Sequence, residues 1–308
     1  MKFLSVILFV CITGCKNSNA SVQCTDQQLQ DTIVSFVLPE IPEMLDSPEL
    51  RADFLTFHYW DHFPFQHIRY TEDTKISEQA FVDYIDLLGH VPIDTAREGM
   101  RQLIARASAS KEMLTYFTDL SEKYLYDPNS PMRNEELYIP VLESMIASSL
   151  LNDTEKIRPA AMLELAKKNR IGTTALDFTY TLASGATGTL HSIPAEFVII
   201  FINNPGCHSC EETMRDMKNS LVLNSMQSQK RLQILAVYPD EELDEWEKHR
   251  NDFPAEWING YDKTLTMREK NLYDLRAIPS LYLLDKDKKV ILKDADLNQI
   301  TYYLRAYF

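Results

Sequence analysis

The sequence predicts an α/β domain with a mixed sheet covered by helices, preceded by a mainly α-helical domain. In the first half, apolar residues recur at helical spacing, whereas after Arg170 they alternate or run together as in strands. Strand and helix patterns then follow one another before a closing hairpin and helix. The 308 residues include only 8 Gly and are 45% hydrophobic, which suits about two domains. We expect the helical domain over residues 31–170 and the α/β domain over residues 171–308.

The first residues predict export. Lys2 is followed by an apolar run over residues 3–12 and by small residues, as in a secretory signal peptide spanning residues 1–14. About ten apolar residues are too few to cross a bilayer, which needs about 20 in a helix. The segment ITGC, placed directly after this run, resembles the lipobox of bacterial lipoproteins. That resemblance implies that Cys15 becomes the lipidated first residue and anchors the chain to a membrane.

Residues 15–30 are polar and are expected to form a tether from the membrane. The formal net charge of −14 argues against binding to nucleic acid and to anionic membrane surfaces. Cys24 lies in the tether and is expected to be a free thiol, with an intermolecular bridge as the alternative. Cys207 and Cys210 then remain as the closely spaced pair of the mature chain.

Helical patterns fill most of residues 31–170. One helix is expected to begin at Ser77 and stop at Gly89, and a long pattern from residue 96 is broken at 127–131. A third helix is expected near residues 137–150, and a fourth capped by Thr154. This half resembles an uncharacterised helical domain that precedes thioredoxin-like domains in some bacterial lipoproteins, a resemblance that implies no activity.

The stretch FHYWDHFPF (57–65) carries two histidines, His58 and His62, four residues apart. Zinc ligands on a helix share this spacing, but no Cys, Asp or Glu cluster completes a site. We therefore expect the aromatic residues to pack between helices, and we predict no metal.

The second half predicts strands. Residues 176–190 alternate around a glycine-containing turn, and AEFVIIFI (195–202) is a continuous apolar run typical of a buried central strand. A further strand is expected over 232–239 and a hairpin over 280–292. Helical segments are expected over 207–226, 241–249, 265–273 and from Leu297 onward.

The stretch NNPGCHSCEE (203–212) therefore lies between a buried strand and a helix. Cys207 is expected at the helix N-terminus, where free N–H groups and the helix dipole stabilise a thiolate. Cys210, one turn further on, is placed to attack a mixed disulfide formed at Cys207. This asymmetry is what thiol–disulfide exchange requires.

Residues 172–308 resemble the thioredoxin-like, TlpA/ResA-type thiol–disulfide oxidoreductases. The opening hairpin, the strand before C-x-x-C and the segment AIPS followed by a strand carry the resemblance. It implies that Pro279, after Ile278, is a cis-proline facing the active-site cysteines. The catalytic set expected from it is Cys207, Cys210 and Pro279.

The sequence departs from the family at three places. Gly206 stands where the family usually has Trp, Phe201 where thioredoxins bury an acid, and Thr213 where ResA-type proteins have Glu. Proton transfer must then use water, His208 or a neighbouring acid such as Glu196. A protonated His208 could also stabilise the Cys207 thiolate, with an exposed spacer as the alternative.

The cysteine pair has three other interpretations. Half of a zinc site lacks a second pair, with only scattered histidines such as His191 and His249 available. A structural disulfide over so short a loop constrains little unfolded chain. A thioredoxin-like module that binds partners through the helical domain without catalysis stays open, because the family's Trp and acid are missing.

The sequence thus predicts a membrane-anchored thiol–disulfide oxidoreductase with no cofactor beyond a redox-active Cys207–Cys210 disulfide. The expected partners are cysteine-containing envelope proteins and an upstream thiol–disulfide electron donor or acceptor, and no nucleic acid. The expected location is the cell envelope, at the outer membrane facing the periplasm, because Lys16 is not the aspartate that retains lipoproteins at the inner membrane in enteric-type bacteria.

Overall fold

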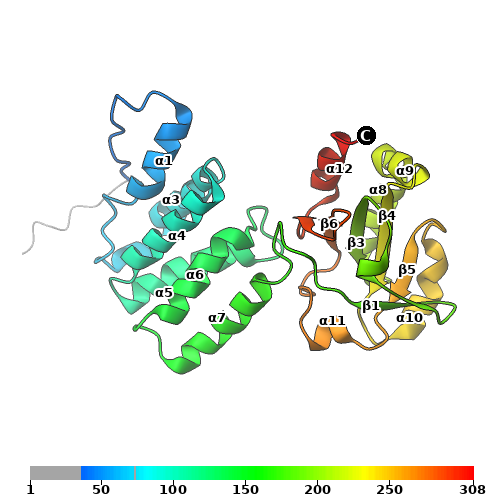
Figure 1. Ribbon diagram of the computed structural model, residues 1–308. Helices are drawn as coiled ribbons and strands as arrows, with labels where there is room; N and C mark the ends of the chain where they lie inside the picture. Colours follow the sequence, from blue (N-terminus) through cyan, green and yellow to red (C-terminus); the bar gives the residue numbers. More distant parts are fainter. Residues whose placement is uncertain (1–35, 73) are drawn as a thin grey trace, which may run out of the picture.

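A computed structural model describes residues 36–72 and 74–308 of the chain. The predicted signal peptide and tether, with Cys15 and Cys24, lie outside the described residues. The described chain forms two parts that lie side by side, an α-helical domain and a domain built around a β-sheet (Figure 1). No helix within the described ranges has the length and apolar character needed to cross a membrane.

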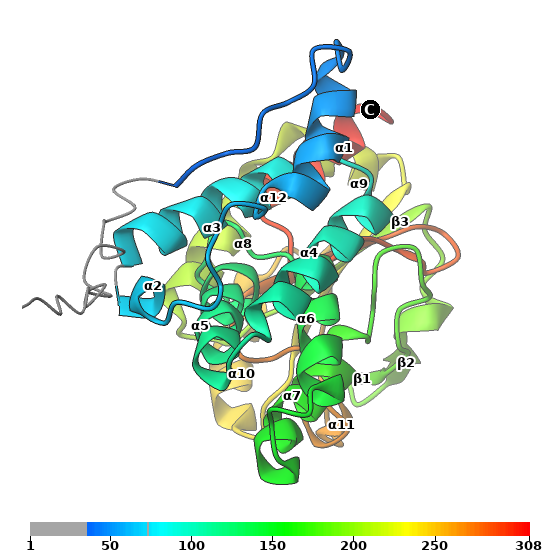
Figure 2. The ribbon, with the colours of Figure 1, turned by 90° about the vertical axis from the view of Figure 1, so that its left-hand side faces the viewer.

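The helical domain lies in front of the sheet domain in Figure 2. Its elements are α1 (Pro48–His58), α2 (Arg69–Glu72), α3 (Thr74–Leu88), α4 (Ile93–Ala107), α5 (Lys111–Ser121), the π-helical turn η1 (Glu122–Tyr126), α6 (Glu135–Ala147) and α7 (Asp153–Ala166). Helix α6 packs against both α4 and α7, which makes it the central helix of this domain.

Three helix limits differ from the sequence prediction. Ser77 lies inside α3, where its hydroxyl donates to the carbonyl of Tyr70 at 2.8 Å. The long pattern is two helices, since Ser110 accepts a hydrogen bond from the Met113 amide and starts α5. Helix α7 is capped by Asn152, in a capping box, rather than by Thr154.

The aromatic stretch packs in the core of the helical domain, as predicted. Trp60 and Phe63 are buried and both meet the ring of Phe117 edge to face, at 5.3 and 5.7 Å between centroids. The two histidines do not share this core. His58 lies at the surface with its Nδ1 2.8 Å from Asp61 Oδ2, and His62 is exposed.

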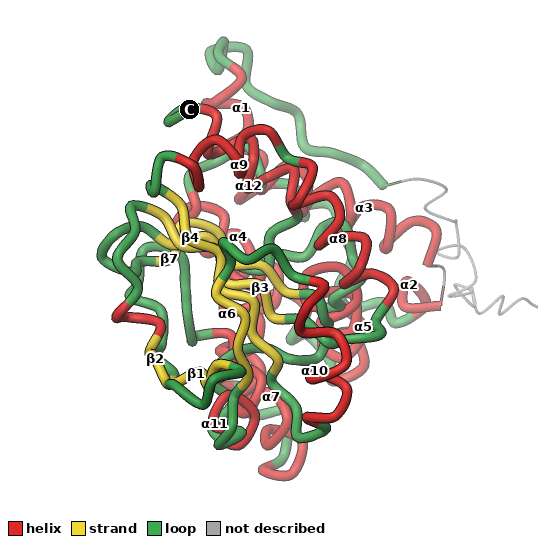
Figure 3. The backbone as a smooth tube through the Cα atoms, turned by 90° about the vertical axis from the view of Figure 1, so that its right-hand side faces the viewer, coloured by secondary structure: helices red, strands yellow, loops and turns green. Residues whose placement is uncertain are grey.

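The sheet domain contains seven strands in one sheet, seen near the middle of the domain in Figure 3. They are β1 (Thr179–Leu182), β2 (Thr187–Thr189), β3 (Phe197–Ile202), β4 (Leu232–Tyr238), β5 (Ile258–Tyr261), β6 (Ser280–Leu284) and β7 (Val290–Leu292). Their order is β2-β1-β5-β4-β3-β6-β7, with β3 parallel to β4 and antiparallel to β6. This is a thioredoxin-like mixed sheet, as predicted. Strand β5 was not predicted, because its four residues include the turn-forming pair Asn259–Gly260.

Helices and two 3₁₀ turns accompany the sheet. They are η2 (Leu190–Ser192), α8 (His208–Asn219), α9 (Leu221–Ser228), α10 (Leu243–His249), η3 (Arg250–Asp252), α11 (Thr266–Glu269) and α12 (Leu297–Arg305). The single helix expected over residues 207–226 is divided at Ser220, whose hydroxyl accepts from the Leu223 amide and caps α9.

Strand β3 is buried over its whole length and separates two apolar cores. Phe197, Ile199 and Phe201 face a core shared with helices α8, α9 and α12. The alternate residues of β3 face a second core that includes Phe178 and Tyr273. Burial on both faces explains the continuous apolar run in the sequence.

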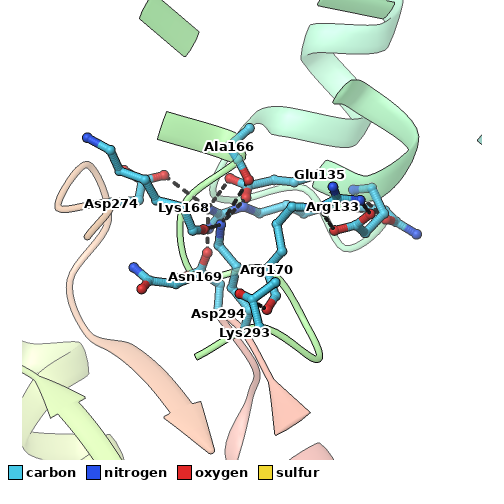
Figure 4. A network of polar contacts seen from close by, with 12 residues as sticks. Arg133, Glu135, Ala166, Lys168, Asn169, Arg170, Asp274, Lys293 and Asp294 are labelled. Atoms are coloured by element: carbon cyan, nitrogen blue, oxygen red, sulfur yellow. Dashed lines mark hydrogen bonds and ion pairs between the residues drawn. The ribbon is translucent and has the colours of Figure 1, made fainter. Parts of the chain in front are cut away.

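The connection between the two domains is held by polar contacts. The side-chain amide of Asn169 donates to the carbonyl of Leu272 at 2.8 Å, and its carbonyl oxygen accepts from the Leu176 amide at 2.8 Å. The ammonium of Lys293, the residue after β7, donates to the Lys168 carbonyl at 2.8 Å. Figure 4 shows Lys168, Asn169 and Lys293 together with Arg133 and Glu135 of the helical domain.

Candidate active site

A tight turn carries the chain from β3 to the cysteine pair. The Cys207 amide donates to the Asn204 carbonyl at 3.2 Å, which closes a turn with Pro205 and Gly206 at its centre. Gly206 has φ +75°, a left-handed conformation that a Trp side chain, usual here in the family, would strain. Cys207 is the N-cap residue of α8, as predicted.

The Cys207 thiol is half-buried at the N-terminus of α8. Burial alone would raise its pKa, but hydrogen bonds from the Cys210 thiol and amide and from Ser209 outweigh that effect. The pKa of Cys207 is therefore lowered from its ordinary value. The Ser209 hydroxyl lies 3.7 Å from Cys207 Sγ. A lowered pKa in a partly exposed thiol is the property of an attacking cysteine.

The Cys210 thiol has the opposite character. Only 4% of the residue is exposed, and it belongs to the apolar core between the sheet and α8. Burial raises the pKa of Cys210 to about 12, and the neighbouring Cys207 adds to the rise. The Asn204 amide, 3.5 Å from Cys210 Sγ, opposes it by donating a hydrogen bond.

Residues from the far end of the chain complete the surroundings of Cys207. The Ile278–Pro279 peptide bond is cis, as the resemblance implies, and β6 begins at Ser280. The Ile278 carbonyl oxygen accepts from Cys207 Sγ at 3.7 Å. The fold thus brings Cys207, Cys210 and the residues around Pro279 together.

The two expected modulators, His208 and Glu196, pair with side chains other than the cysteines. His208 is directed toward the next turn of α8, with its Nε2 3.2 Å from Glu212 Oε1 and its side chain 80% exposed. Glu196 precedes the amino end of β3 and pairs with Arg231 at 2.7 Å, whereas the cysteines follow the carboxyl end of that strand. A six-residue strand is about 20 Å long, so the choice of Glu196 as a proton carrier was wrong.

A pocket beside Cys210 is lined in part by residues that no sequence pattern connects with the cysteine pair. Its walls contain Phe201, Pro205, Cys210, Glu211, Met214, His249, Asp252 and Phe253. His249 Nδ1 lies 3.0 Å from Asp252 Oδ2. Because these two residues follow the first cysteine by some forty positions, only the fold connects them with it. Within the described part of the chain, no three His, Cys, Asp or Glu side chains are grouped closely enough to hold a metal ion.

Comparisons with known proteins agree with this geometry. Residues 14–169 match a family described as a domain of unknown function, DUF5106, and residues 195–290 match a family described as thioredoxin-like. No curated protein matches the chain.

Among solved structures, a thioredoxin-like protein from Bacteroides caccae ATCC 43185 is 56% identical. The match covers 90% of this chain and 100% of that protein, with a TM-score of 0.88. The C-terminal domain of an uncharacterised protein from Bacteroides fragilis NCTC 9343 is 61% identical, covering 44% of this chain and 98% of that domain, with a TM-score of 0.44.

A more distant match is the thioredoxin domain of a thiol–disulfide oxidoreductase from Bacteroides vulgatus. It is 16% identical, covers 45% of this chain and 97% of that domain, and has a TM-score of 0.40. The matched families and the Bacteroides caccae structure show a thioredoxin-like fold joined to a helical domain. The chain belongs to the thioredoxin-like family, in the group that carries an N-terminal DUF5106 domain.

Proposed function

We propose that this protein is a thiol–disulfide oxidoreductase that exchanges disulfides with proteins of the bacterial cell envelope through Cys207 and Cys210. One observation carries the proposal, namely the opposite character of the two thiols. Cys207 is partly exposed with a lowered pKa, and Cys210 is buried with a pKa raised to about 12. Exchange needs one thiolate that attacks and one protected thiol that resolves.

In the reducing direction, the Cys207 thiolate attacks one sulfur of a client disulfide. A Cys207–client disulfide forms, and the client's other sulfur leaves as a thiolate that takes up a proton. Cys210 then loses its proton and attacks the Cys207 sulfur, which releases the second client thiol. The client gains two electrons, and the protein is left with a Cys207–Cys210 disulfide. A second thiol–disulfide protein reverses this change, and the same steps run backward oxidise a client dithiol.

The order of events follows from the coupling between the two thiols. The hydrogen bond and the negative charge of Cys207 both raise the pKa of Cys210. Both disappear when Cys207 is bound in a mixed disulfide, because its sulfur is then neutral. The pKa of Cys210 should fall at that moment, while the Asn204 amide remains to stabilise its thiolate. The resolving thiol is thus activated only when there is an intermediate to resolve.

The location in the envelope rests on the sequence around Cys15. The lipobox-like ITGC after an apolar run supports an acyl anchor there, facing the periplasm at the outer membrane. An exported dithiol meets oxidising conditions, so an upstream electron donor or acceptor must set its redox state. The clients would be envelope proteins that contain cysteines.

The test uses the chain from residue 16 onward with Cys24→Ser, so that Cys207 and Cys210 are its only cysteines. The protein is equilibrated with glutathione buffers of graded ratio, and the fraction carrying the Cys207–Cys210 disulfide is measured by mass spectrometry. Reduction of a model protein disulfide is followed in parallel. We expect a reversible two-electron transition and turnover that Cys207→Ser abolishes.

A cysteine pair that does not equilibrate with glutathione, together with a wild-type protein that does not reduce the model disulfide, would overturn the proposal. The molecule would then act as a thioredoxin-like binding module that recruits partners through its helical domain. Gly206 and Phe201, at the positions where the family has Trp and thioredoxins have an acid, are the residues that favour this second candidate.

A further inference from the structure

The loop between α11 and β6 contacts the redox site on one side and the helical domain on the other. Its last residues place the Ile278 carbonyl against Cys207 Sγ and enter the cis bond to Pro279. Figure 1 shows this loop on the side of the sheet domain that faces the helical domain. Two residues of the loop, Asp274 and Arg276, contact that domain.

Arg276 lies against an aromatic face of the helical domain. The centre of its guanidinium is 3.7 Å from the ring centroid of Tyr126, in η1. The Tyr126 ring is buried and stacks on Tyr138 of α6 at 4.9 Å, so it is a fixed surface. On its other side, the guanidinium donates to the carboxylate of Asp274 at 2.6 Å, through Nη2. Arg276 is thus held between its own loop and the helical domain.

Asp274 forms the second connection. Its carboxylate, 4% exposed, accepts from Arg133 of the helical domain at 3.1 Å and also from the backbone amide of Arg276 at 3.0 Å. Arg133 reaches Asp294 as well, at 2.9 Å (Figure 4). Burial works against ionisation of Asp274, but the hydrogen bonds and charges of Arg276 and Arg133 prevail, and the pKa of Asp274 is lowered. The loop therefore carries a buried carboxylate that a cation of the other domain helps to neutralise.

We propose that the helical domain is a positioning element of the redox site. Through Tyr126 on Arg276 and Arg133 on Asp274, it fixes the loop that places the Ile278 carbonyl and Pro279 beside Cys207. This inference rests on the proposed function and assigns a role to the domain of unknown function. In this loop, the group that contacts the reacting sulfur of Cys207 is the Ile278 carbonyl. The side chains that hold the loop act through it and are therefore positioning residues, namely Tyr126, Arg133, Asp274 and Arg276.

The consequence for Cys207 is specific. A carbonyl oxygen that accepts from the thiol favours the neutral form, so a displaced loop should lower the pH at which Cys207 ionises. The same displacement should move Pro279 away from the approach of a client and slow exchange. A substitution that only weakens folding would change the amount of native protein but not the ionisation midpoint.

The experiment compares full-length mature variants in the Cys24→Ser background. Tyr126→Ala and Arg276→Gln remove the contact from either side, while Tyr126→Phe and Arg276→Lys retain a ring and a cation. Arg106→Ala is the matched control, because Arg106 forms an ion pair with Asp61 in the same domain and is absent from the contacts of the loop. The alkylation rate of Cys207 is measured as a function of pH. The rate at which each variant reduces a model protein disulfide is measured at several concentrations of that disulfide, which gives kcat/KM.

We expect Tyr126→Ala and Arg276→Gln to lower the alkylation midpoint and to reduce kcat/KM about tenfold, as for a small displacement of a reacting group. The two conservative variants and Arg106→Ala should keep the wild-type midpoint. If Tyr126→Ala does not fold, Arg276→Gln in the exposed part of the loop still decides the question. Wild-type midpoint and kcat/KM in a folded Arg276→Gln protein would overturn the inference. Failure of the proposed function looks different, since the wild type itself would then show no exchange.

Discussion

The carbonyl oxygen of Ile278 lies 3.7 Å from the Sγ of Cys207, although 71 positions separate the two residues in the chain. The contact crosses from the end of one loop to the N-cap residue of α8. It places a peptide group, rather than a charged side chain, beside the sulfur that we propose to be the nucleophile. The chemistry of this site should therefore depend on backbone positions as much as on titratable groups.

The first prediction concerns the division of roles between the thiols. Cys210→Ala should accumulate mixed disulfides with envelope proteins, because the Cys207–client intermediate can no longer be resolved. Cys207→Ala should trap few or none, since the remaining thiol is buried and its pKa is raised to about 12. The measurement is a non-reducing gel of cells that carry each variant, compared with the same samples after reduction. Equal trapping by both variants would contradict the assignment.

The second prediction concerns Ser209, whose hydroxyl donates toward Cys207 Sγ. Ser209→Ala should raise the pKa of Cys207, because the thiolate loses one modest hydrogen bond. The midpoint of iodoacetamide alkylation against pH measures it. His208→Ala is the control and should move the midpoint less, because the His208 ring lies against Glu212. A larger shift with His208→Ala would refute this account of the thiolate.

How much of the site the sequence could predict depends on the range of the interactions. The strand, turn and helix around Cys207 follow from local patterns, and all three are present. The cis bond before Pro279 came from a family resemblance. The Arg133–Asp274 contact joins residues 141 positions apart and leaves no local pattern, so only the fold reveals it. Glu196 was wrongly chosen because nearness in sequence ignores the length of an extended strand.

The third prediction concerns Asp294, a buried carboxyl in the contact between the domains. Burial raises the pKa of Asp294 to about 6, above its ordinary value near 3.8. The folded protein therefore binds a proton that the unfolded chain releases between about pH 4 and 6. The stabilisation that comes from protonated Asp294 is full below this pH window and is lost as the pH rises through it. Relative to Asp294→Asn, the free energy of unfolding of the wild type should fall from pH 4.5 to 6.5, as measured by urea denaturation. The same dependence of the free energy of unfolding on pH in both proteins would contradict the prediction.

The fourth prediction concerns Gly99, in the middle of α4. A Cβ at this position would lie 2.6 Å from Tyr84 Oη and 2.7 Å from Thr56 Cγ2. Gly99→Ala should lower the free energy of unfolding by about 1–3 kcal/mol through overpacking, even though alanine favours helices. Adding Tyr84→Phe should recover part of the loss, because it removes one of the two atoms in the way. Thermal unfolding measures both effects, and a stabilised Gly99→Ala protein would show that the helices can separate at this point.

The fifth prediction concerns the proposed anchor at Cys15. Cys15→Ser should yield an unprocessed precursor or a soluble protein, because the lipid acceptor is missing. Fractionation of cells followed by mass spectrometry of the N-terminus provides the measurement. A wild-type protein that begins unacylated at a residue after Cys15 would exclude the anchor.

The contacts of Asn169 and Lys293 across the connection between the domains have a consequence for motion in solution. The sheet domain holds the connection through Asn169 and Lys168, and Arg170 of the connection pairs with Glu136 of the helical domain at 2.8 Å, so the connection should resist hinge motion. The helical and sheet domains should therefore tumble as one particle, with a single rotational correlation time in NMR relaxation. A client of the proposed exchange should then meet a site whose surroundings do not open by movement between the domains.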